Sequence, residues 1–201
     1  MKTANHRYKG KASVKQSYLN EVSLQCPKCS KEAIVTIDSP WIPQRGILKC
    51  FHCMYSQSTS DLVRYNLVLR RNCDSCGKSI RVSIPNLKEK SEKITHTCSH
   101  CGVTRAYNTR NEPYQLLYVS SGKAIDPVFR LSLWFQTEVR GNLFWALNRR
   151  HLTDIKDYVA SLLRERETNL YTTMVEKLPS FMKQAKNREA ILKAIERLEK
   201  L

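Results

Sequence analysis

Cys26-Pro-Lys-Cys29-Ser-Lys-Glu-Ala-Ile-Val-Thr-Ile37 begins a pattern that returns from residue 73 as Cys73-Asp-Ser-Cys76-Gly-Lys-Ser-Ile-Arg-Val-Ser-Ile84. Each copy closes with a second C-x-x-C pair that carries histidine at the same inner position, Cys50-Phe-His-Cys53 and Cys98-Ser-His-Cys101. The two pairs of a copy are separated by 20 residues in the first copy and 21 in the second. All eight cysteines of the 201-residue chain belong to these pairs. The repeat indicates one structural unit that is used twice.

The spacing of the cysteines is typical of a zinc ribbon. Two cysteines that flank a two-residue turn direct both sulfurs to one side, and two such turns surround one ion with four thiolates. Alternating residues at 34–37 and 80–84 predict the short strands that carry the turns. A unit of about 30 residues is too small to fold on its apolar core alone, so the metal stabilises it. Because four protein ligands leave no open position, we expect two structural zinc ions. The predicted ligands are Cys26, Cys29, Cys50 and Cys53 for one ion and Cys73, Cys76, Cys98 and Cys101 for the other.

Three other arrangements of the cysteines compete with this interpretation. Redox-active C-x-x-C pairs occur in a βαβ context, which this sequence lacks. A cross-braced site would combine the first pairs of the two copies, although the repeat favours ligands from within one copy. His52 or His100 could replace a cysteine as ligand, but four sulfurs already suffice.

The residue that follows each cysteine pair distinguishes the two copies. The second copy has Gly77 and Gly102 there, and glycine adopts a positive φ without steric cost. The first copy has Ser30 and Met54 at the same places. We therefore expect its zinc ion to be held less tightly.

Outside the cysteine pairs, the sequence predicts a mixed chain in four segments. Residues 1–20 form a basic arm, 21–72 the first ribbon, 73–120 the second ribbon, and 124–201 a mainly helical domain with its own core. The predicted fold class is therefore α+β: two tandem small β zinc ribbons followed by a mainly helical C-terminal domain.

Local patterns place the remaining elements. Further strands are predicted at 62–69, 114–119 and 131–139. Gly141 interrupts the last of these, and the apolar content of 142–151 predicts a short buried helix. Thr153 is the predicted N-cap of the next helix, and the last helix begins near Asn187. The predicted inward side chains of that last helix are Ile191, Ala194, Ile195 and Leu198.

The chain is strongly basic. Its 34 Lys and Arg against 18 Asp and Glu give a formal charge of +16, and two zinc tetrathiolate sites, each near −2, reduce this to about +12. The excess is spread over the whole length of the chain. A positive field of this size favours nucleic acid, because phosphate contacts release counterions. An acidic protein or the ribosome would satisfy the same field.

The leading functional hypothesis is a non-catalytic, zinc-dependent nucleic-acid-binding protein, part of transcription or of another nucleic-acid machine. The candidate contacts, to DNA or RNA, are Lys9, Lys11 and Lys15 in the arm, Arg70, Arg71, Arg105 and Arg110 on the ribbon flanks, and Arg149 and Arg150. The alternative is a zinc-stabilised protein–protein interaction adaptor that docks a partner through residues 130–151, where Trp and Arg are typical interface anchors. Four aromatic residues in that stretch either stack bases or, as we favour, form core: Trp134, Phe135, Phe144 and Trp145.

Several other classes of function have no support in the sequence. It holds no P-loop, no H-E-x-x-H, no G-x-S-x-G and no dinucleotide fingerprint, so we expect neither catalysis nor a small-molecule substrate. The longest apolar runs are far shorter than the ~20 residues that cross a bilayer. The basic first residues lack the apolar region of a secretory signal, so we expect a reducing, cytoplasmic location.

Two parts of the chain resemble known proteins. The blocks Cys26–Cys53 and Cys73–Cys101 resemble the zinc ribbons of the general transcription factor class, which RNA polymerase subunits, primosomal helicases and ribosomal proteins share. The runs 133–152 and 178–189 are similar to uncharacterised bacterial zinc-ribbon-containing proteins with a helical C-terminal domain. The resemblance implies a tandem zinc-ribbon fold, bound zinc and a bacterial cytoplasmic origin, and it implies no mechanism.

Overall fold

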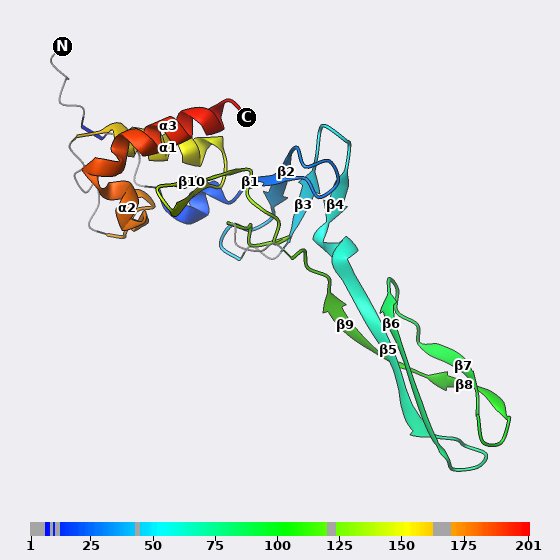
Figure 1. The fold of residues 1–201 in the computed structure, drawn as a ribbon. Coiled ribbons are helices and arrows are strands. Elements are labelled where there is room, and N and C mark those ends of the chain that lie inside the picture. The colour runs from blue at the N-terminus through cyan, green and yellow to red at the C-terminus, as the bar shows by residue number, and fades with distance from the viewer. Residues whose placement is uncertain (1–6, 9, 11–12, 43–44, 120–123, 163–169) are drawn as a thin grey trace. The chain divides into compact units, whose positions relative to one another are not determined.

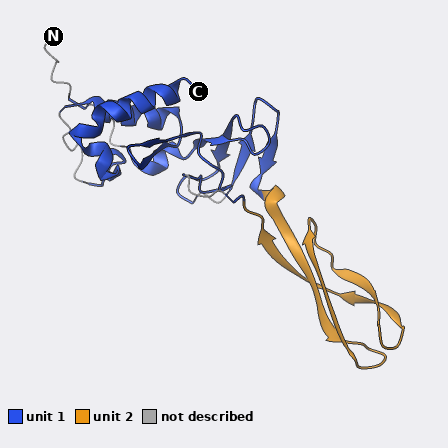
Figure 2. Cartoon of the chain, viewed as in Figure 1, with its two compact units in different colours: residues 1–59, 118–201 blue, residues 60–117 orange. Residues whose placement is uncertain are grey.

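The fold is known from a computed structural model, which describes residues 7–8, 10, 13–42, 45–119, 124–162 and 170–201 (Figure 1). Antiparallel sheets make up the N-terminal half and helices dominate the C-terminal end, which confirms the predicted α+β class. The chain forms two compact units, residues 1–59 with 118–201, and residues 60–117 (Figure 2). Among the described residues, no helix is long and apolar enough to cross a membrane.

The first ribbon is a four-stranded antiparallel sheet with the order β1-β2-β3-β4. Its strands are β1 (Glu21–Gln25), β2 (Glu32–Ile37), β3 (Gly46–Lys49) and β4 (Ser56–Ser58). Val22 lies opposite Val35, and Leu24 lies opposite Ala33, with all four side chains buried. A slip of one residue would turn this apolar set to solvent, so the alternation in the sequence fixes the register.

Strand β1 also binds the C-terminal part of the chain. The Ser23 N–H donates to the Leu147 carbonyl at 2.8 Å, and the Trp134 N–H donates to the Ser23 carbonyl at 2.9 Å. The Gln25 N–H donates to the Ser132 carbonyl at 2.9 Å. The first ribbon and the C-terminal elements therefore share one compact unit, and the unit boundaries differ from the predicted segments 21–72, 73–120 and 124–201.

The C-terminal part combines a hairpin with helices. The hairpin consists of β10 (Phe135–Val139) and β11 (Asn142–Ala146), and the α-helices are α1 (Arg149–Ala160), α2 (Ser180–Lys183) and α3 (Arg188–Glu199). Short 3-10 turns cover η1 (Lys15–Tyr18), η2 (Thr59–Leu62), η3 (Val175–Lys177) and η4 (Ala185–Asn187). Helix α3 buries the four side chains predicted to face inward, so this prediction is confirmed. Phe135 and Phe144 are also fully buried, as the core interpretation of the aromatic stretch expects.

The predicted helix at 142–151 is wrong. Arg140 and Gly141 both have positive φ, at 50° and 74°, which makes the two-residue turn of a β-hairpin. Residues 143–146 alternate between more exposed and buried positions and pair with β10, so the prediction relied on apolar content and overlooked its period. The Thr153 N-cap is wrong for a related reason: α1 begins earlier, where the Asn148 side chain accepts from the His151 N–H at 2.9 Å.

The second unit contains a three-stranded sheet and a hairpin. The sheet has the order β6-β5-β9, with β5 (Val63–Asn72), β6 (Ser79–Leu87) and β9 (Arg110–Gln115), and the hairpin joins β7 (Lys93–Thr97) to β8 (Thr104–Asn108). The core between them consists of Leu69, Cys73, Ile80, Cys98 and Tyr107. The strand predicted at 114–119 starts earlier and ends at Gln115, because its partner Val63 is the first residue of β5.

Candidate metal centres and basic sheet face

The eight cysteines form two local clusters of four sulfurs. In each cluster the sulfurs all lie within 4.8 Å of one another. The Cys26–Cys53 and Cys29–Cys50 sulfur pairs are 3.7 and 3.5 Å apart. A tetrahedral ion with zinc–sulfur bonds of about 2.3 Å places its sulfurs about 3.8 Å apart, so the geometry fits one metal ion. The cysteines are free thiols, which excludes a disulfide framework in the structure.

The second cluster repeats this geometry. Its sulfur pairs Cys73–Cys101 and Cys76–Cys98 are 3.7 and 3.8 Å apart. Each cluster takes all four of its cysteines from a single copy of the repeat. The predicted local pairing is therefore confirmed, and the cross-braced alternative is wrong. His52 and His100 lie exposed beside the clusters and belong to neither.

Each cysteine pair sits on the same backbone turn. The N–H of the first cysteine donates to the carbonyl five residues later, for example Cys26 to Lys31 at 2.8 Å and Cys73 to Lys78 at 2.7 Å. The residue that follows each pair has a positive φ: Ser30 at 60°, Met54 at 58°, Gly77 at 70° and Gly102 at 72°. Serine and methionine thus adopt a conformation that favours glycine, and the first copy keeps the same turn at a conformational cost.

Turn amides favour the thiolate form of one cysteine in each cluster, Cys50 and Cys73. The backbone N–H groups of Cys76 and Ser75 lower the pKa of the Cys73 thiol to about 6. Burial raises the pKa of Cys50, but the N–H groups of Cys53 and His52 outweigh it and lower this pKa to about 7. Thiolate is the form that ligates metal, so the backbone prepares both clusters for a cation.

Cys53 and Cys101, the last cysteine of each cluster, show the repulsion that a cation would relieve. The Tyr55 N–H favours the Cys53 thiolate, yet burial and the neighbouring sulfurs raise the pKa of Cys53 to about 12. The pKa of Cys101 is raised to about 11 in the same way, against the N–H of Val103. Four thiolates so close together repel one another unless a cation is bound between them. A coordinating metal supplies that positive charge and deprotonates its thiol ligands.

Comparison with protein-family models, curated proteins and solved structures finds no match to this chain.

The predicted nucleic-acid contacts are not all in one place. Lys9 and Lys11 lie outside the described residues. Lys15 lies over the Trp145 ring, with 5.6 Å from its Nζ to the ring centroid. Arg150 lies over the Tyr18 ring at 5.2 Å. Both side chains have an aromatic neighbour within unit 1, so each contributes to local packing there.

Arg149 is also tied to its own unit. Its guanidinium lies 5.2 Å from the Phe135 ring centroid and 3.8 Å from Glu32 Oε2 on the first ribbon. It also donates to the Glu199 carbonyl at 3.3 Å. Arg149 therefore joins the first ribbon to the C-terminal helices, and its side chain has partners within unit 1.

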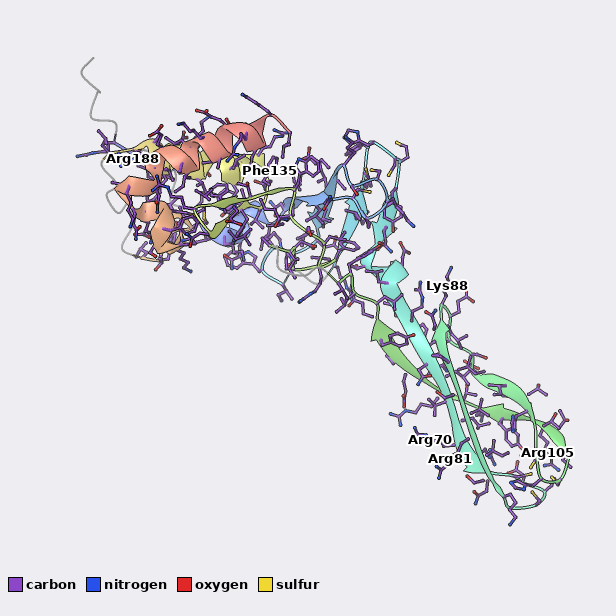
Figure 3. The ribbon with its side chains drawn as sticks, in the orientation of Figure 1. Arg70, Arg81, Lys88, Arg105, Phe135 and Arg188 are labelled. Atoms are coloured by element: carbon purple, nitrogen blue, oxygen red, sulfur yellow. The ribbon has the colours of Figure 1, made fainter. Side chains whose placement is uncertain are left out.

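Two of the predicted arginines lie on one face of the three-stranded sheet. Arg70 on β5 is directly opposite Arg81 on β6, and Figure 3 shows both side chains on the same side of unit 2. Arg110 on β9 pairs with Val68, two residues from Arg70, so alternation places it on this face. We call the face defined by Arg70, Arg81 and Arg110 the arginine face. It includes an open hollow of about 630 Å³ lined by Val68, Arg70, Arg71, Asn72, Ser79, Arg81, Val82 and Ser83.

The other two predicted arginines of unit 2 have different surroundings. Arg71 lies 5.0 Å from the Tyr107 ring centroid, and its Nη2 lies 2.5 Å from Asp74 Oδ1. Arg105 is exposed on β8, away from Arg70 and Arg81 (Figure 3). Strand alternation places neither side chain on the arginine face. Arg71 nevertheless lines the hollow of that face.

Sequence reasoning missed Arg81. Residues 80–84 were predicted as a strand, and alternation already places Arg81 and Ser83 on its polar side. Arg81 lies opposite Arg70 because β5 and β6 form a hairpin around Cys73 and Cys76, and the pairing of these two strands was not predicted.

Proposed function

We propose that each four-cysteine cluster binds one zinc ion and that both ions are structural. The donor set is all sulfur, the separations fit a tetrahedron, and the turn amides favour thiolates. Four protein ligands leave no position for substrate or water, so the ions stabilise the fold of the ribbons and take no part in catalysis. The resemblance of the cysteine blocks to zinc ribbons of transcription factors and RNA polymerase subunits supports the same assignment.

We further propose that the chain is a non-catalytic nucleic-acid-binding protein, and that the arginine face contacts phosphates. The observation that carries this proposal is the Arg70–Arg81 cross-strand pair. Like charges directly opposite each other destabilise a sheet, so this pair costs folding energy. Among the described residues neither guanidinium has an acidic partner within salt-bridge distance. An anion bound between them would relieve the repulsion.

The surroundings of the pair favour phosphate. No Asp or Glu lines the hollow, whose polar groups besides arginine belong to Ser79, Asn72 and Ser83, and the Ser83 hydroxyl donates to Asn66 Oδ1 at 3.0 Å. Such groups and arginine are the usual donors to phosphate oxygens. Arg110 is 82% exposed, and its only acidic contact in the described chain is Glu112 at 3.7 Å, an exposed pair of little strength. The face thus presents donors without competing carboxylates at its centre.

The test is salt-dependent binding of single- and double-stranded probes to the zinc-loaded full chain, read by fluorescence anisotropy. Loss of two phosphate contacts in Arg70→Gln/Arg81→Gln lowers the slope of log K against log salt by about 1.8 on duplex and about 1.4 on single strands. A control with equal charge loss, Lys88→Gln/Lys93→Gln, at two exposed positions outside the arginine face, leaves the slope closer to wild type. Binding that is absent at low salt, or equal slopes for the two double variants, contradicts the proposal.

A further inference from the structure

The second turn of the first ribbon carries exposed apolar side chains that its counterpart lacks. Phe51 is 70% exposed and Met54 is 80% exposed. The equivalent positions in the second ribbon are Ser99 and Gly102. The two copies share the same backbone turn and sulfur geometry, so metal binding does not require an apolar residue at either place.

Met54 is kept in an unfavourable conformation. Its φ of 58° is in the left-handed region, where glycine is free of strain and a side chain is not. A buried side chain could offset that strain by packing, but this one is largely in solvent. Backbone strain that no packing contact offsets is a feature of functional sites. The strained and exposed Met54 therefore suggests a contact with a molecule outside the chain.

Lysines lie on or next to the two turns that carry the cysteines of the first ribbon. The sulfurs of Cys26 and Cys53 lie 3.7 Å apart, which brings the first turn beside the second. Lys28 of the first turn lies over the Tyr55 ring, 5.6 Å from its centroid. Residues 26–31 and 46–58 contain Lys28, Lys31 and Lys49 and no Asp or Glu. Three lysines outweigh a zinc tetrathiolate of about −2 by a small margin, and Lys28 is the one that a printed contact places beside the second turn, next to Met54.

We infer that Phe51 and Met54, with Lys28 beside them, bind an unpaired base of single-stranded nucleic acid. We call these three residues the stacking site. The base stacks on the Phe51 ring, the flexible Met54 thioether covers its edge, and Lys28 attracts the adjacent phosphate. This inference rests on the proposed nucleic-acid function and adds a preference for single strands, because a base in a duplex does not expose its face.

The composition favours a base over a protein surface. A stable protein interface buries at least ~1,000 Å² around an apolar core of several side chains. The two turns of the first ribbon expose one aromatic ring and one thioether among lysines. An aromatic ring in a basic setting is the usual platform for single strands, where each stacked base adds affinity without sequence specificity.

The experiment compares single-stranded and duplex oligonucleotides of one sequence on the zinc-loaded full chain, with 2-aminopurine in the single strand as a stacking probe. Phe51→Ala weakens single-strand binding about fivefold or more and leaves duplex binding within twofold of wild type. Phe51→Trp preserves the single-strand affinity. Ser99→Ala, the matched change in the second ribbon, alters neither affinity.

Met54→Gly separates the inference from a folding defect. Glycine relieves the strained turn, so this variant unfolds at a higher temperature and yet binds single strands more weakly. If wild type binds both probes and Phe51→Ala binds single strands equally well, the stacking site is overturned while the arginine face stands. If Phe51→Ala spares nucleic acid but loses a stoichiometric protein partner, the site is a protein contact and the inference is likewise overturned. If wild type binds no probe, the proposed function itself has failed.

Discussion

Arg70 lies directly opposite Arg81 in the antiparallel pair of β5 and β6. The two like charges lower the stability of the sheet, and the same charges favour the binding of an anion. We expect Arg81→Glu to create a cross-strand ion pair with Arg70 and to raise the free energy of unfolding by about 0.2–1 kcal/mol. The same change removes a positive charge and adds a negative one, so nucleic-acid affinity falls. Chemical denaturation and anisotropy measure the two effects, and a variant that loses both stability and binding would contradict this account.

Glycine at position 30 should stabilise the first ribbon. Ser30 has a φ of 60° and takes the place of Gly77, whose φ is 70°. A side chain in the left-handed region costs about 1–2 kcal/mol, so Ser30→Gly should recover about 1 kcal/mol after the extra chain entropy of glycine. The reverse change, Gly77→Ala, meets no atom within 4 Å and should lose a similar amount through φ alone. Thermal unfolding of zinc-loaded protein tests both; no shift in either variant argues against strain in the turns.

Removal of metal should unfold the second unit before the C-terminal core. Cys73 and Cys98 are themselves part of the core of unit 2. The helices of unit 1 bury side chains such as Ile155 and Ile191 far from any cysteine in the sequence. With a chelator, hydrogen exchange should lose protection across β5, β6, β7 and β8 and retain it in α1 and α3. Retained protection throughout unit 2 would show that its fold does not depend on metal.

His151 should make the protein less stable in acid. Burial, with a smaller effect of Lys15, lowers the pKa of His151 to about 3. Its Nδ1 accepts from the Leu147 N–H at 3.1 Å, and its ring stacks on Tyr18 at 4.8 Å, so the folded state holds it neutral. Below pH 6.5 the unfolded chain binds a proton that the folded chain excludes. Stability is therefore lost as pH falls, at about 1.4 kcal/mol per unit between about 6.5 and 3.

The comparison that isolates this histidine uses His151→Gln. Both proteins contain the same cysteine clusters, so the difference between their unfolding free energies cancels any contribution of these clusters in acid. We expect the difference to change with pH below 6.5 and to be constant above it. A difference that does not vary with pH would mean that His151 is protonated in the folded state.

The sequence predicted the parts of the fold that local rules control. The cysteine spacing predicted both clusters, since a C-x-x-C turn brings its sulfurs together whatever surrounds it. The periodicity of 187–199 predicted α3 and its buried side. The hairpin at 140–141 was missed because its turn depends on a positive φ at Arg140, a residue that seldom adopts it.

The arginine face was predicted only in part, because the pairing of β5 with β9 joins strands that are far apart in the sequence. Arg70 and Arg110 were chosen as isolated cations, but they lie on one face of a sheet because β9 pairs with β5. The hydrogen bonds of β1 to residues 132–134 and 147 likewise join segments more than 100 positions apart. Such contacts depend on how the whole chain packs, so a single sequence gives no direct sign of them.

The second ribbon is an insertion within the unit that contains the first. The chain leaves unit 1 after Thr59 and returns at Tyr118, whose hydroxyl donates to Gln57 Oε1 at 2.6 Å and lies 3.3 Å from the Tyr55 hydroxyl. The points of departure and return are thus neighbours. Residues 60–117 are therefore an inserted unit whose two ends lie close together. Substitutions in this unit can change its surface charge while the connections within unit 1 stay the same.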